Sequence, residues 1–369
     1  MFIPVNSPLL DGNEKQYLAE CIASGWISSE GPYVRRFEAE FAASVHRKNG
    51  IAVSSGSGAL DIAVAALRLG PGDEVIMPSF TIISCAQAVV RAGATPVLVD
   101  SDPESWNMDS SRVAGRITER TKAVMAVHIY GLTVDMENIL DVADRHGLHV
   151  IEDTAQAIGQ TCNGRPCGSF GNLSIFSFYT NKHITTGEGG MVVTDDDELA
   201  ERCRSLRDLC FQKGKRFFHE ELGWNYRMTN LQAAVGCAQL ERLAAHVSRK
   251  REIGARYTEL LGGLPVQLPL ASTRSSDNIY WVYGLVLQDE VTMDTDEVMA
   301  RLADRNIGTR PFFWPMHEQP VFQKLGLFKG ESLPVAERLA RRGFYLPSGL
   351  ALKDKEIEYV AGALRQILS

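Results

Sequence analysis

The chain lacks the features that mark membrane, secreted and nucleic-acid-binding proteins. Its formal net charge is −7 at pH 7, so no global basic field would attract nucleic acid or an anionic membrane. No segment has the length and continuous apolarity of a membrane span. The opening stretch, MFIPVNSPLLDGNE, lacks the basic and apolar regions of a signal peptide. We therefore expect no nucleic-acid or membrane partner, and local groups must hold any anionic ligand.

The cysteines also lack the spacing of a disulfide framework or a metal site. The seven cysteines are odd in number and scattered along the chain. Cys162 and Cys167 are too far apart for a CxxC pair, and no second pair accompanies them. The sequence therefore predicts reduced thiols in a cytoplasmic protein, with no metal centre.

What is present is a regular alternation of short apolar runs and helical patterns. Hydrophobic residues make up 45% of the 369 residues, enough to bury a large core. Such an alternation predicts an α/β fold, with a mostly parallel sheet covered on both faces. Strands are expected at 50–53, 74–77, 95–99, 122–127 and 148–151, and helices between them at 57–69, 82–92 and 135–146.

The texture changes in the last third of the chain. A helical pattern without an internal proline begins at Thr229 and is typical of a connector that leaves a large domain. Beyond it we expect a strand at 279–287, a helix near 295–305, a strand entering Arg310 and a final helix from about 354. The sequence predicts a large domain over 1–245 and a smaller α+β domain over 246–369. The aromatic residues Tyr280, Trp281 and Tyr283 are expected in the core of the smaller domain.

Polar groups occupy three junctions where an expected strand ends, which is where open parallel sheets bind ligands. The first is SSGSGAL at 54–60, before a helix. Its small residues would let backbone N–H groups approach an anion, and the helix N-terminus adds a favourable dipole, which suits a phosphate. Alone this is ordinary helix capping, and the stretch is neither a Walker A loop nor a GxGxxG fingerprint.

The other two junctions carry Asp153 and Lys182. Asp153 either caps the next helix or is a fixed anion that keeps a heterocyclic nitrogen protonated, as pyridoxal phosphate requires. Lys182 lies between apolar runs at 175–178 and 191–194, where a desolvated amine would be a nucleophile toward carbonyls. Ser177 would bond either the backbone or the same phosphate. Together these groups fit one cofactor, pyridoxal phosphate.

The sequence resembles the DegT/DnrJ/EryC1/StrS sugar aminotransferases, which are pyridoxal-phosphate enzymes of the aspartate-aminotransferase-like fold (fold type I). Within that family the likeness is greatest to members that aminate C4 of a GDP-linked 4-keto-6-deoxymannose. The resemblance covers essentially the whole chain. It is carried by LDGNE, GWISSEGP, PGDEVIMPSFT, GATPVLVD, TKAVMAVHIYG, VIEDTAQAIG, SFYTNKHITTGEGG and GWNYRMTNLQAA.

The resemblance implies roles for particular residues around the cofactor. Lys182 would be the Schiff-base lysine, Asp153 the partner of the pyridine nitrogen, and Gln156 the partner of the ring oxygen. Ile82 would cover the pyridine ring where relatives usually have an aromatic residue. Asn225 would reach the phosphate of a neighbouring subunit, which implies a homodimer with shared sites. The phosphate itself would be held by Ser55, Gly56, Ser57 and Ser177.

The resemblance also implies the substrates. Trp314 and His317 would lie in the sugar-facing part of the site, although the following Glu-Gln-Pro departs from the relatives. A basic run with Lys215 and Arg216 is either a solvated loop or a clamp for the nucleotide diphosphate. The implied reaction moves an amino group from L-glutamate, through the pyridoxamine form, to the C4 keto group of a nucleotide-linked 4-keto-6-deoxy sugar for surface polysaccharide or glycoside biosynthesis.

Two alternatives stay open. One is amination of another dTDP- or UDP-linked keto sugar, at C3 or C4. The other is a sugar dehydratase on the same scaffold. Dehydratase relatives carry histidine at the Schiff-base position, whereas a lysine, as at 182, can both hold the cofactor and move a proton, so transamination is favoured. His128 and Tyr130 are expected either beside the pocket or in structural roles, and Arg227 either joins the basic clamp or forms a structural ion pair.

Overall fold

The computed structural model describes residues 2–212, 214, 215 and 217–368. Its centre is a seven-stranded sheet in the order β1-β9-β8-β5-β4-β2-β3. β9 runs antiparallel to both of its neighbours, and the other neighbouring strands are parallel, so the predicted mostly parallel sheet is confirmed. The strands are β1 (Asn49–Val53), β2 (Glu74–Pro78), β3 (Thr95–Val99), β4 (Thr121–Val127), β5 (His149–Asp153), β8 (Leu173–Ser177) and β9 (Gly190–Thr194).

This topology decides which side chains can meet. β1 and β8 both pair antiparallel with β9, so they run in the same direction as each other and as β5. Their carboxyl ends, at Val53, Ser177 and Asp153, therefore lie at one edge of the sheet. Residues that follow β1 are thus brought to those that follow β5 and β8, although about a hundred positions or more separate them in the sequence.

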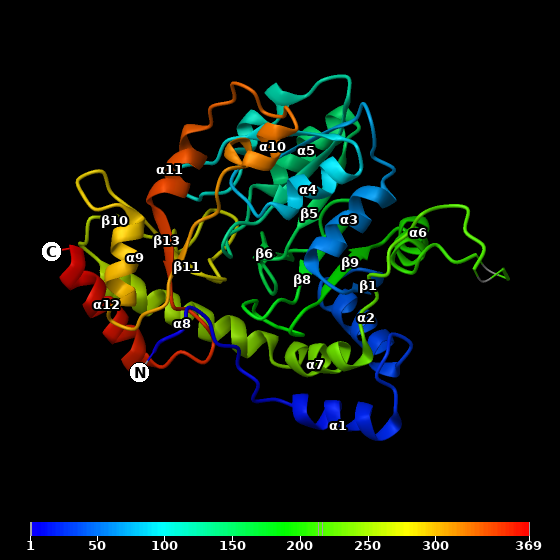
Figure 1. The fold of residues 1–369 in the computed structure, drawn as a ribbon, viewed down its shortest axis with the longest axis horizontal. Helices are drawn as coiled ribbons and strands as arrows, with labels where there is room; N and C mark the ends of the chain where they lie inside the picture. Colours follow the sequence, from blue (N-terminus) through cyan, green and yellow to red (C-terminus); the bar gives the residue numbers. More distant parts are fainter. Residues whose placement is uncertain (1, 213, 216, 369) are drawn as a thin grey trace.

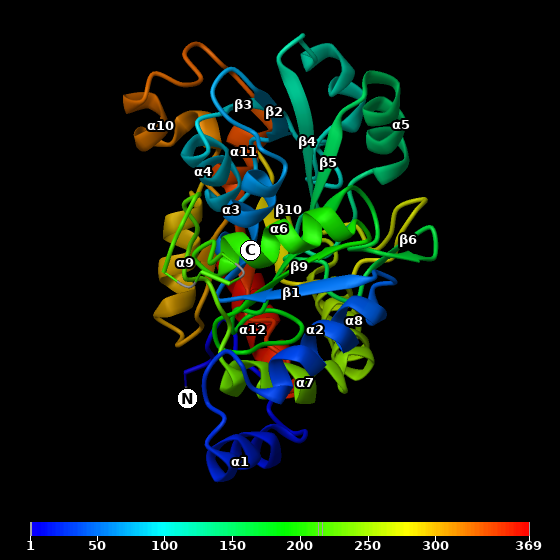
Figure 2. The ribbon, with the colours of Figure 1, turned by 90° about the vertical axis from the view of Figure 1, so that its right-hand side faces the viewer.

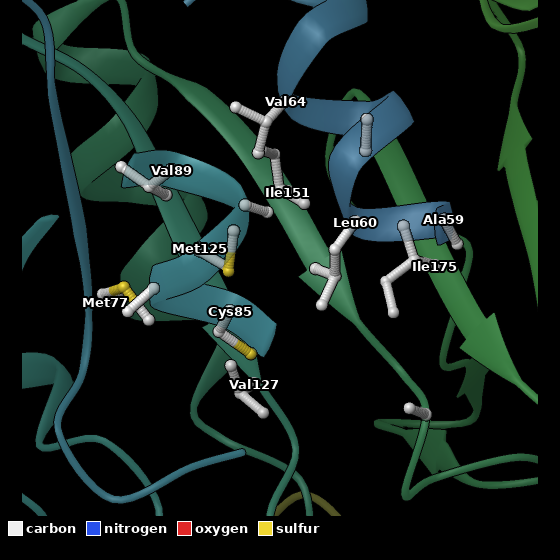
Figure 3. Packing of buried hydrophobic residues seen from close by; sticks show 14 of the residues in the cluster. Ala59, Leu60, Val64, Met77, Cys85, Val89, Met125, Val127, Ile151 and Ile175 are labelled. Carbon is white, nitrogen blue, oxygen red and sulfur yellow. The ribbon is translucent and has the colours of Figure 1, made fainter. Parts of the chain in front are cut away.

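Helices cover both faces of the sheet (Figures 1 and 2). α3 (Gly56–Ala66), α4 (Ser84–Arg91) and α6 (Asp197–Arg207) pack into one hydrophobic cluster. On the other side lie α2 (Pro32–Ser44), α5 (Met136–His146) and α7 (Asn230–Leu240), with α1 (Glu14–Ser24) packed outside α7. Figure 3 shows Leu60 of α3 near the strand residues Ile151 and Ile175, and Cys85 of α4 near Val127. Because both faces are covered, the strands are apolar along almost their whole length.

The C-terminal third forms a second, antiparallel sheet of four strands in the order β10-β11-β13-β12. These are β10 (Val266–Gln267), β11 (Tyr283–Leu287), β13 (Gly343–Leu346) and β12 (Arg310–Pro311). α8 (Leu243–Leu261), α9 (Thr295–Ala303) and α12 (Asp354–Leu368) share its hydrophobic cluster. α10 (Pro320–Lys324) and α11 (Pro334–Arg342) return toward the large sheet, and β6 (Thr161–Cys162) and β7 (Arg165–Pro166) form a separate small hairpin. The predicted boundary at 245 and 246 falls inside α8 and stays a prediction.

Two expectations about elements were wrong. The helical pattern from Thr229 is two helices, since α7 ends at Leu240 and α8 begins at Leu243. The strand expected from 279 begins only at Tyr283, because Ile279 and Trp281 donate backbone hydrogen bonds to the turn at Gly131 and Tyr130 instead.

The reduced thiols are confirmed, since all seven cysteines are free and buried. Among the residues that the structure describes, no helix has the length and apolarity needed to cross a membrane.

Candidate active site

A cavity of about 290 Å³ opens at the carboxyl-terminal edge of the large sheet, where β5 and β8 end. The second sheet closes its far side. Sixteen residues line it: Gly56, Ser57, Leu60, Ile82, Ser84, Asp153, Ala155, Gln156, Ile175, Ser177, Tyr179, Asn181, Lys182, Trp281, Phe313 and Tyr345.

The N-terminus of α3 forms one end of the cavity. Ser55 is the N-cap residue, and its hydroxyl accepts a hydrogen bond from the Gly58 N–H at 3.0 Å. A side chain at Gly56 would place its Cβ 2.6 Å from the Ser177 Cβ, so only glycine lets the helix start this close to β8. The hydroxyls of Ser57 and Ser84 lie 2.8 Å apart at the same place. Free N–H groups, a helix dipole and several hydroxyls together suit a phosphate.

Asp153, the last residue of β5, presents a fixed carboxylate to the cavity. The side chain is almost fully buried, and Oδ1 accepts the Ala155 N–H at 3.0 Å. Oδ2 accepts the thiol of Cys85 at 3.2 Å. Burial raises the pKa of Asp153, while the two hydrogen bonds and the amine of Lys182 lower it in part. The carboxylate therefore keeps one orientation.

Lys182 lies in the loop between β8 and β9, as expected. Burial lowers the pKa of its amine to about 7, although the nearby charge of Asp153 acts in the opposite direction. A large fraction of the amine is therefore uncharged at neutral pH and able to attack a carbonyl carbon. The Nζ atom lies 3.5 Å from the ring centroid of Trp281.

The wall opposite the sheet is aromatic. Trp281, Phe313 and Tyr345 all come from the C-terminal third of the chain. The prediction that Trp281 belongs to the core of the smaller domain was wrong, because the left-handed backbone of Tyr280, at a φ of 47°, directs its neighbour toward the large sheet. Tyr280 and Tyr283 do lie in that core, so their prediction is confirmed. An apolar wall of this kind keeps water from the Lys182 amine.

The remaining predicted cofactor residues lie in or against this cavity. Gln156 is buried, and its Oε1 accepts the Tyr130 N–H at 2.9 Å, so the amide NH₂ is the end left to donate to a ligand. Ile82 lines the cavity and is 39% exposed, which leaves its face open to a ring. Phe80, two positions earlier, is instead fully buried against Phe312 and Phe313.

Of the predicted substrate residues that the structure describes, none lies in the cavity lining. His317 is 4% exposed, and its ring is fixed by Ser79 at 2.9 Å and by Glu337 at 3.1 Å. Trp314 is exposed, with the guanidinium of Arg341 5.5 Å from its ring centroid. Lys215 is also exposed, beside the ring of Phe218, and Arg216 lies outside the described residues.

Asn225 and two of the residues left open also lie away from the lining. Asn225 is exposed and accepts a hydrogen bond from Arg227 at 2.9 Å. Arg227 forms an ion pair with Asp208 at 2.7 Å, which is the structural alternative of its two predicted roles. His128 is fully buried and hydrogen-bonded to Glu152 at 3.0 Å, a structural role.

The sequence interpretation did not find several lining residues. Ser84, and Cys85 behind it, follow the end of β2, so the rule about strand ends that found Asp153 could also have indicated them. Phe313, Tyr345 and Trp281 carried no such signal. Their place in the cavity depends on how the second sheet packs against the first.

Comparison with known proteins agrees with this geometry. Residues 8–365 match the DegT/DnrJ/EryC1/StrS aminotransferase family. The GDP-perosamine synthase of Vibrio cholerae is 42% identical over 363 residues, covering 98% of both chains. That of Caulobacter vibrioides is 43% identical over 368 residues, covering 99% of this chain and 98% of the relative. Among solved structures, the aminotransferase TlmJ from Streptoalloteichus hindustanus superposes with a TM-score of 0.92 at 33% identity, covering 99% of this chain and 98% of that one.

Proposed function

The chain belongs to the DegT/DnrJ/EryC1/StrS aminotransferase family, and we propose that it aminates C4 of a GDP-linked 4-keto-6-deoxy sugar with L-glutamate as donor. It is an aminotransferase that depends on pyridoxal phosphate. The observation that carries the chemistry is an amine of lowered pKa beside a buried carboxylate in one cavity. The sugar and nucleotide are proposed from the relatives, and the donor from the resemblance of the sequence.

The residues present fit pyridoxal phosphate. The start of α3, with Ser57 and Ser177, would hold the phosphate, and Asp153 would hold the proton on the ring nitrogen. Gln156 would donate to the ring oxygen, and Ile82 would cover one face of the ring. When bound, this cofactor supplies an electrophilic carbon and a ring that takes up the electron pair left by a removed proton.

Lys182 would do the proton transfers. With a pKa of about 7 the amine exists in both protonation states at neutral pH, so Nζ can accept a proton from a donor carbon and later return one. Asp153 stays fixed while this happens, because its two hydrogen bonds hold the carboxylate and also oppose the effect of burial on its pKa. The aromatic wall excludes water from the proton as it moves.

A direct experiment tests both substrate and donor. The protein is loaded with pyridoxal phosphate and treated with L-glutamate until the visible absorbance of the lysine-bound cofactor is lost. GDP-, dTDP- and UDP-linked 4-keto-6-deoxy sugars are then added separately. Return of the absorbance with the GDP sugar alone is expected, and Lys182→Ala, which cannot hold the cofactor covalently, is the control.

Other outcomes correct the proposal in defined ways. Return of the absorbance with a dTDP or UDP sugar would keep the chemistry and change the substrate. Product formed without an equal amount of 2-oxoglutarate would instead indicate a dehydratase. Failure of glutamate to bleach the absorbance would contradict the proposed donor.

We further propose a cytoplasmic homodimer in which Asn225 completes the site of the neighbouring chain. The exposed position of Asn225 and the seven free, buried thiols support this reading. Lys182→Ala and Asn225→Ala chains, each inactive alone, should regain activity when they are mixed under conditions that exchange subunits. A mixture that stays inactive, although hybrid dimers form, would contradict the shared site.

A further inference from the structure

Trp281 makes more hydrogen bonds than a residue needs if it only packs in the cavity wall. Its backbone N–H donates to the carbonyl of Tyr130 at 3.1 Å, and its indole N–H to the carbonyl of Asn181 at 2.9 Å. Its own carbonyl accepts a hydrogen bond from the amine of Lys250 at 2.7 Å. Only 6% of the residue is exposed. Two of these hydrogen bonds fix the backbone of Trp281, and the third fixes its indole ring.

The face of this ring meets the reacting amine. The Nζ atom of Lys182 lies 3.5 Å from the ring centroid. A cation over the face of tryptophan is attracted by the ring, and the attraction grows when water is excluded. The carbonyl that accepts the indole N–H belongs to Asn181, the residue directly before Lys182, so this hydrogen bond ties the ring to the backbone next to the lysine.

We propose that the indole face of Trp281 is the resting place of the Lys182 amine whenever that amine is not bonded to the cofactor. This inference rests on the proposed role of Lys182. A released lysine side chain has four rotatable bonds and would otherwise lose its orientation. Held over the ring, Nζ stays at the cavity and is ready for the next proton transfer.

The charged and titratable groups around the Lys182 amine, together with the Trp281 ring, determine its pKa, and the contribution of the ring can be measured. Asp153 and Cys85 face Lys182 from β5 and α4, and both act to raise its pKa. Burial lowers the pKa of the adjacent His183 to about 3, so this imidazole carries no charge near neutral pH. Because the ring favours the ammonium form, replacing it by an aliphatic side chain of similar burial should lower the pKa of Lys182.

The test measures the titration of Lys182 in the pyridoxamine-phosphate form, where the lysine is free. The protein is labelled with trace acetic anhydride across a pH series, and modification of each lysine is read by mass spectrometry. The exposed Lys122 and Lys355 are internal controls in the same digest. We expect Trp281→Leu to lower the labelling midpoint of Lys182 by about one pH unit, and Trp281→Phe to lower it less.

Fluorinated tryptophan allows the same labelling experiment with almost no change in the shape of the side chain. Fluorine withdraws charge from the ring face, so uniformly fluorotryptophan-substituted protein should also show a lower midpoint. The same substitution in Trp281→Phe, where the other four tryptophans remain, should have no effect. This comparison decides the matter even if the leucine variant fails to fold.

The outcomes are distinct. An unchanged or higher midpoint in both the leucine variant and the fluorinated protein would overturn the proposal. Under the proposal kcat falls about tenfold in Trp281→Leu while KM for the sugar stays constant, with partial recovery in the phenylalanine variant. Failure of every sugar to react would refute the proposed substrate, yet leave the labelling result interpretable.

Discussion

At the scale of the residue, the proposed chemistry depends on a carboxylate that must stay ionised inside the protein. Asp153 is almost fully buried, and the Ala155 N–H and the Cys85 thiol donate to it. Asp153→Asn keeps the shape of the side chain but removes the negative charge. We expect the fold to be retained and kcat to fall about a hundredfold or more, measured as 2-oxoglutarate formed per site. Near-normal turnover would mean that another group faces the ring nitrogen.

Cys85 should set the acid side of the pH profile. Its thiol lowers the pKa of Asp153 by donating to the charged form, so Cys85→Ala raises that pKa. The carboxylate is then protonated at higher pH, and the acid limb of kcat should move upward by about half a pH unit. Cys85→Ser, which keeps a donor, should restore the profile.

A second cysteine provides the matched control for this series. Cys203 is equally buried in the same hydrophobic cluster, but it lies on α6, whereas the thiol of Cys85 donates to Asp153. Cys203→Ala should lose a little stability and leave the pH profile unchanged. An equal shift of the acid limb in Cys203→Ala and Cys85→Ala would refute a specific effect on Asp153.

At the scale of the element, β9 supports the start of α3. Gly190 is the first residue of β9, and a Cβ there would lie 2.4 Å from the carbonyl oxygen of Ser55 and 2.9 Å from the nitrogen of Gly56. Gly190→Ala should therefore displace the proposed phosphate site. We expect the dissociation constant of pyridoxal phosphate to rise at least about tenfold and the protein to lose about 1–3 kcal/mol.

Another glycine separates this effect from glycine replacement in general. Gly362 lies in α12, and no atom would be within 4 Å of an added Cβ. Gly362→Ala should leave cofactor affinity unchanged and stabilise the helix by up to about 1 kcal/mol. Wild-type affinity for the cofactor in Gly190→Ala would argue against α3 as the phosphate site.

The elements also explain how far the sequence could be interpreted. The parallel core was predictable because each buried strand is a short apolar run between amphipathic helices, and the ends of β1, β5 and β8 then place Ser55, Asp153 and Ser177 at one edge. The aromatic wall was not predictable. Trp281 belongs by sequence to an apparent strand, and its place depends on the left-handed turn at Tyr280 and on contacts with residues 150 positions away.

The contacts of the His317 ring nitrogens also could not be predicted from the sequence. A histidine near the end of the chain resembled a sugar-facing residue, yet it is buried between Ser79, which follows β2, and Glu337 of α11. Neither contact has a local pattern. Such pairings arise from the packing of the two sheets, which no periodicity within one segment encodes.

At the scale of the whole molecule, one buried amine of α8 holds the segments that flank two strands of the second sheet. Lys250 is 2% exposed and donates to the carbonyls of Trp281 and Ser348, which flank β11 and β13. Burial lowers its pKa to about 7. In the unfolded chain the same amine titrates near its ordinary value of about 10.4, so above pH 7 the unfolded state binds more protons at this position.

The sign of the pH dependence follows from that difference. Stability contributed by Lys250 is lowest below pH 7, where both states are protonated, and increases as the pH rises. Between pH 7 and 8.5 the gain from Lys250 is about 1–2 kcal/mol. Unfolded thiols, which titrate at about pH 8.5, act in the opposite direction over the same range, so the contribution of Lys250 is the difference in slope between the wild type and a variant without this amine. In cofactor-free protein, Lys182 adds a rise of the same sign because its pKa is also about 7. Lys250→Met should therefore reduce the rise in the free energy of unfolding, measured with urea at each pH, without abolishing it. The exposed Lys355→Met should retain the wild-type slope, and an unchanged slope in Lys250→Met would mean that the buried amine is not the group that titrates.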